Sequence, residues 1–435
     1  MPSADRTLTL GAATSVVVTP GPGLPMGGYA ARDKAAVGVL DDLEASVLWL
    51  QGGHGGDVMW ISLDVLAINN LVRKGLVHAV SQATGVAGWQ VVVAASHTHS
   101  GPAGWHGEIH PVLPTEVDRE ACELLAATVG GAAASLVGKL APVRLSWNQD
   151  DVDGVGSNRH DAAGPHDRSV GVLSVRDLDA RPVAVLYDHA CHPTVLGPEN
   201  LRWSSDWVGA ARARIRSELA YPQGDPLPVI FLQGSAGDVS ARFHRHSRDQ
   251  TEVERLGSIV GDAVVRAWRK PASEVAPSFV HVRRTTVELP ARGVDEPSSR
   301  LPSEVLVGAG AIPVADYMAA DAVDRLRTSM QEGQNSRAAM LAIGLPAVRH
   351  LPISLVEVGD RRWLNLPVEM CAALGSQISA GKPALRVIGY TDAYCGYVAD
   401  SASHLAGHYE ALTSFFDAST SERFVATCRD YVESS

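Results

Sequence analysis

Short apolar runs that end in glycine- or proline-marked turns recur along the chain, and such runs predict buried strands. The clearest begins at Val91, where VVVAAS leads directly into HTHSGPAG. A hairpin is predicted later, because two apolar runs flank Gly359 and Asp360. The other predicted strands are Glu44–Trp49, Asp57–Leu66, Val143–Trp147, Gly171–Val175, Pro182–Tyr187, Val229–Leu232, Phe279–Leu289, Ile353–Val358, Arg362–Leu366 and Ala384–Gly389.

Other segments place apolar residues at helical spacing behind a capping residue. Ser205 and Asp206 precede one such helix, whose apolar positions run from Trp207 to Leu219. Thr115 and Asp118 form a capping-box-like start of a long amphipathic helix that reaches about Lys139. Further helices are predicted over Asn69–Ala83, Glu252–Arg269, Ala315–Gly333 and Ser336–Ala342.

The order of these elements predicts the fold class. Strands and helices alternate irregularly, which favours an α/β (mixed α+β) fold with mixed β-sheets covered by helices over a regular βα barrel. We expect residues 1–435 to form a single domain. The best internal linker or loop lies near 290–303, where Pro290, Pro297 and Pro302 stand among mixed charges.

The composition indicates a globular protein of a reducing compartment. Hydrophobic residues make up 46% of the chain, and the net charge of -11 argues against nucleic-acid binding. The five cysteines are scattered without a C-x-x-C pair, which favours free thiols. The first residues show no secretory signal, and no run approaches the roughly 18 apolar residues of a membrane span. We therefore expect a cytoplasmic protein without stable membrane insertion; the sequence leaves a homo-oligomer open.

Four strand ends deliver polar residues into turns, as catalytic sites often require. They are Ser96–His99, Asp188–His192, Asp238–Ser240 and Asn365–Glu369. Side chains two apart on a strand point to the same face, so His97 and His99 are expected to address one point in space. His-x-His at the end of a buried strand is a common start of a zinc site, and a carboxylate with a further nitrogen would complete an open tetrahedral site.

Motifs in a fixed order add a family resemblance. HTHSGPAG at His97 to Gly104 resembles the signature of the neutral/alkaline (non-lysosomal) ceramidase family, and the resemblance implies that family's catalytic fold. Other segments resemble the family in the same order: PMGGYAAR (25–32), ISLDVLAIN (61–69), SNR (157–159), HPTVLGPENLRWSSDWVGAA (192–211), GSAGDVSAR (234–242), NLPVEM (365–370) and YCGYVADSASHLAGHYEA (394–411).

The resemblance implies one zinc ion and its ligands. Carried over by position, the ligands are His97, His192, Glu369 and Tyr397. Neutral imidazoles and a carboxylate are ordinary zinc ligands, and a cation would lower the pKa of a bound phenol. Tyr394 could exchange roles with Tyr397. His189 is the alternative to His192, but only His192 is followed by the proline of the motif.

The resemblance also implies catalytic roles. His99 and Tyr409 would stabilise the oxyanion of a tetrahedral intermediate, and Arg159 would anchor a polar or anionic part of the substrate. Ser240 is a nucleophile or a positioning group; the GDVS loop lacks the strand–Ser–helix elbow of serine hydrolases, which favours positioning. Asp238 would orient a neighbouring ligand or loop.

The expected reaction is hydrolysis of a small-molecule N-acyl amide by a zinc-activated water. Departures from the family shape the substrate expectation. Ala241-Arg242 replace Pro-Asn and Val368 replaces a glycine. The chain stops soon after Tyr409, so the family's C-terminal β-sandwich domain is expected to be lacking. With aromatic residues at only 6%, a soluble amide is favoured over membrane ceramide.

Three alternatives to hydrolysis of a linear amide remain. The same site could form an amide or lactam or transfer an acyl group, because the transition state is shared in both directions. A barrel-type metal-dependent amidohydrolase also begins with His-x-His, but it requires regular βα spacing. A non-catalytic, zinc-stabilised binding protein would close its site with cysteine and histidine, unlike this set.

Overall fold

The structure is a computed structural model, and it describes residues 8–29, 31–53, 56–107, 116–221, 224–271, 273–275, 279–292, 304–307, 310–313 and 348–434. The predicted helices Ala315–Gly333 and Ser336–Ala342 lie outside the described residues, as do Thr115 and most of the predicted linker near 290–303.

A nine-stranded mixed sheet forms the first half of the fold. Its strands β4 and β5 pair in parallel, as do β9 and β11, and the remaining pairs are antiparallel. The strand order is β11 (Val229–Gln233), β9 (Pro182–His189), β8 (Ser169–Asp177), β6 (Ala141–Asp151), β1 (Leu10–Val17), β3 (Glu44–Gln51), β4 (Asp57–Leu63) and β5 (Val91–Ala95), with β13 (Ser273–Glu274) beside β6.

Two helix pairs cover one face of this sheet. Helices α1 (Asn70–Thr84) and α2 (Arg119–Ala134) share an apolar core with β3, β4 and β5, whereas α3 (Trp207–Glu218) and α4 (Gln250–Arg269) share one with β8, β9 and β11. The predicted cap at Asp206 is confirmed, because its side chain accepts from the Trp207 amide. Asn69 caps α1 by accepting from the Val72 amide. The predicted start of α2 near Thr115 is wrong: Asp118 accepts a hydrogen bond from the Ala121 amide, so the helix begins at Arg119.

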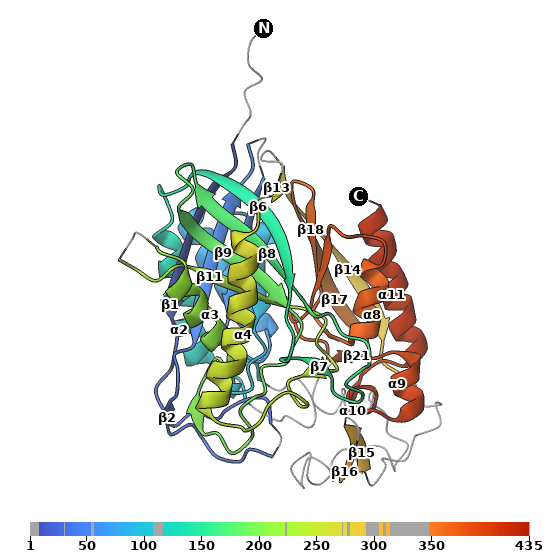
Figure 1. Cartoon of the computed structure of the whole chain (residues 1–435). Coiled ribbons are helices and arrows are strands. Elements are labelled where there is room, and N and C mark those ends of the chain that lie inside the picture. Colours follow the sequence, from blue (N-terminus) through green and yellow to red (C-terminus); the bar gives the residue numbers. More distant parts are fainter. Residues whose placement is uncertain are drawn as a thin grey trace.

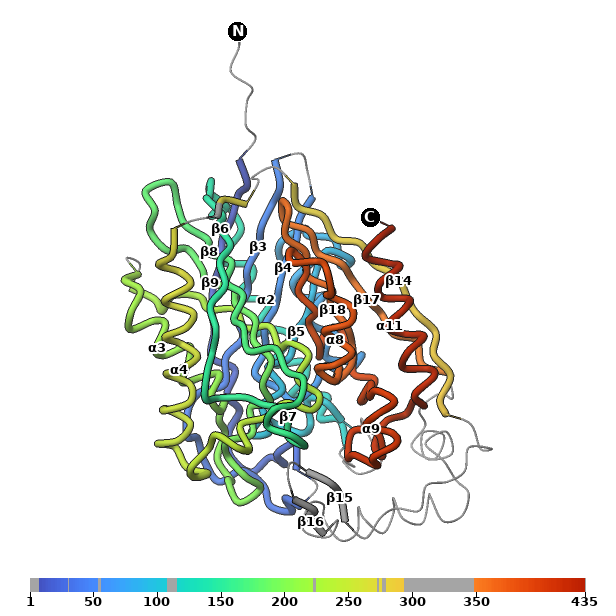
Figure 2. Tube along the Cα trace, turned by 45° about the vertical axis from the view of Figure 1, so that its right-hand side comes forward, coloured from blue at the N-terminus to red at the C-terminus, as the bar shows by residue number. Residues whose placement is uncertain are grey.

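A smaller sheet packs against the other face. It runs β14 (Val280–Pro290), β17 (Val348–Val358), β18 (Arg361–Asn365) and β20 (Leu385–Ile388). Between the sheets, the Trp363 ring meets those of Trp60 and Trp147 edge-on, with centroids 5.7 and 5.5 Å apart. Helices α8 (Ala372–Ser379) and α11 (Ala418–Glu433) pack on the outer face of the smaller sheet, so the layers run helix, sheet, sheet, helix (Figures 1 and 2).

Among the described residues, four further pairs of short segments lie outside these two sheets. They are β2 (Gly38–Val39) with β10 (Arg202–Trp203), β7 (Ser157–Asn158) with β12 (Val239–Ser240), β19 (Glu369–Met370) with β21 (Tyr397–Val398), and β15 (Glu304–Val307) with β16 (Gly310–Pro313). The remaining elements are η1 (Gly88–Gln90), η2 (Ala103–Trp105), α9 (Ser401–Ala406) and α10 (Tyr409–Thr413).

This architecture confirms the predicted mixed α+β class. The described sheets are open and mixed and form no βα barrel, so the barrel-type amidohydrolase alternative is wrong. The five cysteines are buried free thiols. Within the described ranges, no helix has both the length and the apolar character needed to cross a bilayer.

Candidate metal centre

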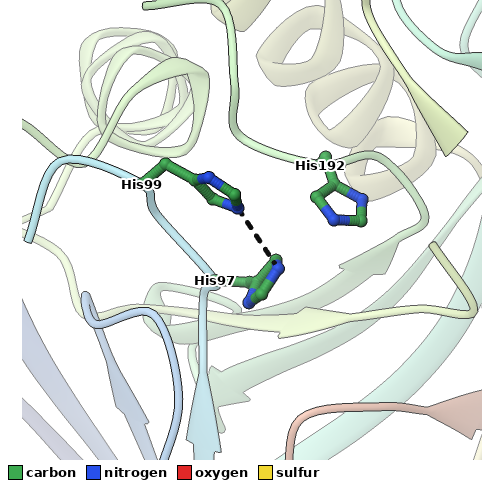
Figure 3. Close-up of side chains that lie close together, drawn as sticks. All are labelled: His97, His99 and His192. Atoms are coloured by element: carbon green, nitrogen blue, oxygen red, sulfur yellow. Dashed lines mark hydrogen bonds between the residues drawn. The ribbon is translucent and has the colours of Figure 1, made fainter. Parts of the chain in front are cut away.

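The His-x-His segment lies just beyond a strand, not on it. β5 ends at Ala95, and His97 adopts a left-handed backbone with φ 67°. The expectation that strand alternation brings His97 and His99 to one face is therefore wrong. A tight turn brings them together instead: the His97 amide donates to the Val65 carbonyl, and the two Nε2 atoms lie 3.3 Å apart (Figure 3).

Backbone carbonyls fix the tautomers of two histidines. The Nδ1–H of His97 donates to the Leu66 carbonyl at 2.6 Å, and that of His192 donates to the Ala236 carbonyl at 2.6 Å. A carbonyl oxygen can only accept, so each Nε2 carries a lone pair when the ring is neutral. Hydrogen bonding of the remote ring nitrogen is how proteins orient metal-binding imidazoles.

A buried carboxylate faces both of these lone pairs. The Glu369 Oε2 atom lies 3.3 Å from His97 Nε2 and 3.2 Å from His192 Nε2. All three side chains are almost completely buried. Three acceptor atoms in mutual contact repel one another unless a proton or a cation lies among them. The donor set therefore fits a metal ion.

The charges of the site agree with this arrangement. Burial lowers the pKa of His192 and lowers that of His99 strongly, so both imidazoles are neutral near pH 7. Burial opposes ionisation of Glu369, whereas positive charge at the His97 and His192 ring nitrogens holds the pKa of that carboxyl well below its usual range. Where these rings are neutral, a cation bound beside the carboxylate would supply that charge. His99 offers a further ring nitrogen, within 4.8 Å of those of His97 and His192.

Two tyrosines hold the carboxylate. The Tyr394 hydroxyl makes a short hydrogen bond to Glu369 Oε1, and the Tyr390 hydroxyl donates to Oε2 at 3.3 Å. The Tyr390 ring also lies against that of His97, with centroids 4.2 Å apart. Burial, with the Glu369 charge beside it, holds the pKa of both phenols well above the ordinary value, so both remain donors.

Tyr397 lies beside the carboxylate but has a different partner. It pairs with Glu369 across β19 and β21, and its hydroxyl accepts from Arg159 Nη2 at 3.5 Å. The sequence left open whether Tyr394 or Tyr397 is the ligand. In the structure the two differ: Tyr394 donates to Glu369 Oε1, and Tyr397 faces Arg159. The assignment of Tyr397 as a ligand stays a prediction.

The β7–β12 pair brings Arg159 and Ser240 to the same centre. The backbone of Ser240 forms an isolated parallel β-bridge with that of His192, and the Ser240 Oγ accepts from the Arg242 amide at 3.4 Å. Asp238 ties this pair together: its backbone carbonyl accepts from the Arg159 amide and its Oδ2 accepts from Asn158 Nδ2 at 2.7 Å. Burial raises the pKa of Asp238 to about 6. The placement agrees with the predicted loop-orienting role of Asp238.

Two further predicted residues, His189 and Tyr409, have partners other than His97, His192 and Glu369. His189 donates through Nδ1 to the Ser169 carbonyl at 3.1 Å and packs edge-on against Trp207, away from the cluster. Tyr409 lies next to Tyr397, with ring centroids 5.9 Å apart, and its ring faces the Arg159 guanidinium. The joint action of Tyr409 with His99 stays a prediction.

Two residues of the N-terminal loop were missed as parts of the site. The Tyr29 ring packs 4.8 Å from that of His99, and Arg32 Nη1 donates to the His99 carbonyl at 2.7 Å. Gly28 fits directly below His99 with φ 96°, where an added Cβ would lie 2.5–2.7 Å from three His99 atoms. The PMGGYAAR motif was the available signal for these residues. Tyr390 carried no such signal in its local sequence.

Comparison with protein families finds a match over residues 9–255 to the description "Neutral/alkaline non-lysosomal ceramidase, N-terminal". The matched part contains His97, His99, Arg159, His192 and Ser240. The segments that carry Glu369, Tyr390, Tyr394, Tyr397 and Tyr409 lie beyond it.

Two solved structures share the fold. One is a crystal structure of neutral ceramidase from Pseudomonas aeruginosa, with a TM-score of 0.76 and 16% identity; the match covers 99% of this chain and 75% of that one. The other is described as "Ceramidase complexed with C2", with a TM-score of 0.77 and 17% identity, covering 98% of this chain and 74% of that one. At these identities the likeness concerns the fold.

Proposed function

The chain belongs to the neutral/alkaline non-lysosomal ceramidase family, and we propose that it is a zinc-dependent amide hydrolase that cleaves an N-acyl amine with metal-activated water. One observation carries the proposal. Two tautomer-fixed imidazoles and an ionised carboxylate, from His97, His192 and Glu369, direct their acceptor atoms at a common point. Nitrogen and carboxylate donors that leave a position open are typical of catalytic zinc.

His97, His192 and Glu369 would hold the ion, with Tyr397 as the fourth ligand. When bound, zinc lowers the pKa of its water toward about 7 and polarises a carbonyl oxygen. Tyr394 keeps the carboxylate oriented through its hydrogen bond to Oε1. Such support from outside the ligand set preserves the geometry of metal sites.

The other side chains act on the substrate. His99 and Tyr409 stabilise the carbonyl oxygen as it becomes negative, and Arg159 binds a polar or anionic part of the substrate. Ser240, beside His192, positions substrate or water. A proton must reach the leaving amine, and a carboxylate or tyrosine of the centre relays it.

The substrate that we propose is a soluble N-acyl amine met in the cytoplasm. To test this, a panel of N-acyl amines that includes N-acyl sphingosines is incubated with the zinc-loaded protein and with His97→Ala, and products are identified by mass spectrometry. We expect hydrolysis of short polar amides and none by the variant. Cleavage of N-acyl sphingosines alone would overturn the soluble substrate. Condensation of free acid and amine without hydrolysis would identify a synthetic enzyme.

Removal of the metal is expected to abolish turnover while leaving the fold largely intact. The ligand side chains are held by backbone carbonyls and by Tyr394, so the centre does not depend on the ion for its assembly. We expect one zinc per chain by elemental analysis. Chelation should lower activity by more than about 100-fold, and stoichiometric zinc should restore it. Unfolding of the metal-free protein would instead indicate a structural ion.

Substitution of Gly28 by alanine is expected to displace His99. The new Cβ would overlap the His99 side chain and backbone, and misplacement of a catalytic group by about 1 Å can cost 100-fold in rate. We expect kcat/KM to fall by about 10- to 100-fold, with zinc content unchanged. Gly23→Ala is the matched control, since Gly23 has φ 97° but no atom within 4 Å of an added Cβ. Equal losses in both variants would exclude an effect through His99.

A further inference from the structure

A second cluster of titratable side chains lies behind Arg159. The Glu410 carboxylate is fully buried and accepts at Oε1 from Arg159 Nε at 2.5 Å. Its Oε2 faces His160 Nε2 at 2.6 Å. The His160 ring, in turn, stacks on that of His408. Of these residues, only Arg159 was assigned a role from the sequence, although His408 and Glu410 lie within the motif at 394–411.

His160, His408 and Glu410 lie close enough to hold a metal ion, but their geometry opposes it. The two rings are stacked with centroids 3.7 Å apart and an angle of 4° between their planes. An ion shared by both would lie roughly 1.8 Å out of each plane, whereas bonds of about 2.0–2.1 Å to a nitrogen lone pair lie near the plane. The cationic Arg159 on the same carboxylate opposes a metal further.

The contacts of Glu410 point to a different role. Arg159 uses Nε for the carboxylate and directs Nη2 at the Tyr397 hydroxyl, so the bond to Glu410 fixes the direction of the guanidinium plane. Burial opposes ionisation of Glu410, but Arg159 and His160 outweigh it and lower its pKa to about 2. The carboxylate is therefore charged throughout the neutral range, and a charge-assisted bond of this kind is stronger than a neutral one.

We propose that Glu410 is a positioning residue that holds Arg159 against Tyr397, and that His160, stacked on His408, holds Glu410 from the other side. This inference rests on the proposed function, in which Arg159 binds the substrate. In the contacts described, the Glu410 carboxylate binds Arg159 and His160 and none of the proposed metal ligands, so it acts through Arg159.

A double-mutant cycle tests this proposal with the best substrate of the panel. We expect Glu410→Leu to lower kcat/KM by about 10- to 100-fold, with the same division between kcat and KM as Arg159→Met. The double variant should be no worse than Arg159→Met alone, because a residue that acts through another loses its effect when that other is gone. Glu410→Gln keeps an acceptor for Arg159, so it should retain part of the activity. Additive losses, or no loss in Glu410→Leu, would overturn the proposal.

Controls separate positioning from folding. Glu44→Gln disturbs another largely buried glutamate, whose oxygens accept from Arg216 at 2.7 and 2.8 Å. It should lower the melting temperature without changing the division between kcat and KM. If Glu410→Leu does not fold, Glu410→Gln and the double variant, which leaves no unpaired charge at this pair, carry the test.

A crystallographic experiment needs no turnover. If no panel member is hydrolysed, the proposed function fails, and the crystal structure of Glu410→Leu beside the parent protein still decides the positioning claim. Displacement of the guanidinium from the Tyr397 hydroxyl supports it, with a smaller displacement expected in Glu410→Gln, which keeps one acceptor. An Arg159 unchanged in both variants overturns it.

Discussion

Replacement of Glu369 by glutamine is expected to abolish both metal binding and turnover. The carboxylate is the only formal negative charge in contact with His97 and His192 in the contacts described, and the amide would present either a weaker donor atom or an N–H to them. Loss of a residue that merely supports a ligand costs about 10- to 100-fold in affinity or activity. Loss of a charged ligand should exceed that range.

The measurement is zinc stoichiometry by elemental analysis together with kcat/KM on the best panel substrate. Glu357→Gln is the control, since Glu357 lies on β17 and pairs with Arg283 at 3.7 Å, apart from the centre. It should bind zinc and turn over substrate like the parent. Full zinc content and activity in Glu369→Gln would refute the assignment of the ligand set.

Truncation of Trp363 to alanine should cause the largest loss of stability. Its ring is completely buried between the two sheets and meets Trp60 and Trp147 edge-on. The substitution removes an aromatic side chain and leaves a cavity, which typically costs about 3–5 kcal/mol. Denaturant unfolding followed by fluorescence would measure the change in the free energy of unfolding.

Trp89→Ala provides the comparison, because the Trp89 side chain is 51% exposed. A surface truncation of this kind usually changes stability by about 0.5 kcal/mol or less. Equal losses in the free energy of unfolding for the two variants would show that the Trp363 contacts between the sheets do not stabilise the fold.

Local signals predicted most of the elements. Strand β11 and helix α3 were recognisable because a continuous apolar run, helical spacing and the Asp206 cap are properties of neighbouring residues. The order of the four layers was not predicted, since the sequences of β14, β17, β18 and β20 indicate strands without any sign of which sheet face they cover. Long-range packing decides that arrangement.

The candidate site was predictable in its residues and not in its geometry. The motifs named His97, His192 and Glu369, and the structure brings these three together. The left-handed turn at His97 depends on carbonyls of Val65 and Leu66, more than thirty positions earlier in the chain. No local pattern reports such contacts.

Supporting residues were the hardest to predict. Glu410 lies 251 positions from Arg159 along the chain, and the motif at 394–411 that contains it gives no sign that the two pair. Tyr390 reads as an apolar residue after a strand, although its hydroxyl reaches Glu369. Only the folded chain identifies such partners.

The left-handed non-glycine residues bear on how this protein could be engineered. Among the described residues, His97, Asp206, Tyr390 and Asp392 adopt positive φ close to the centre or in the loops that carry it, and Ala180 does so in the turn between β8 and β9. Such backbone costs of order 1–2 kcal/mol per residue. Substitutions that relax the backbone at the first four positions would raise thermal stability but disturb the geometry of the centre. The Ala180 turn can be redesigned without that loss.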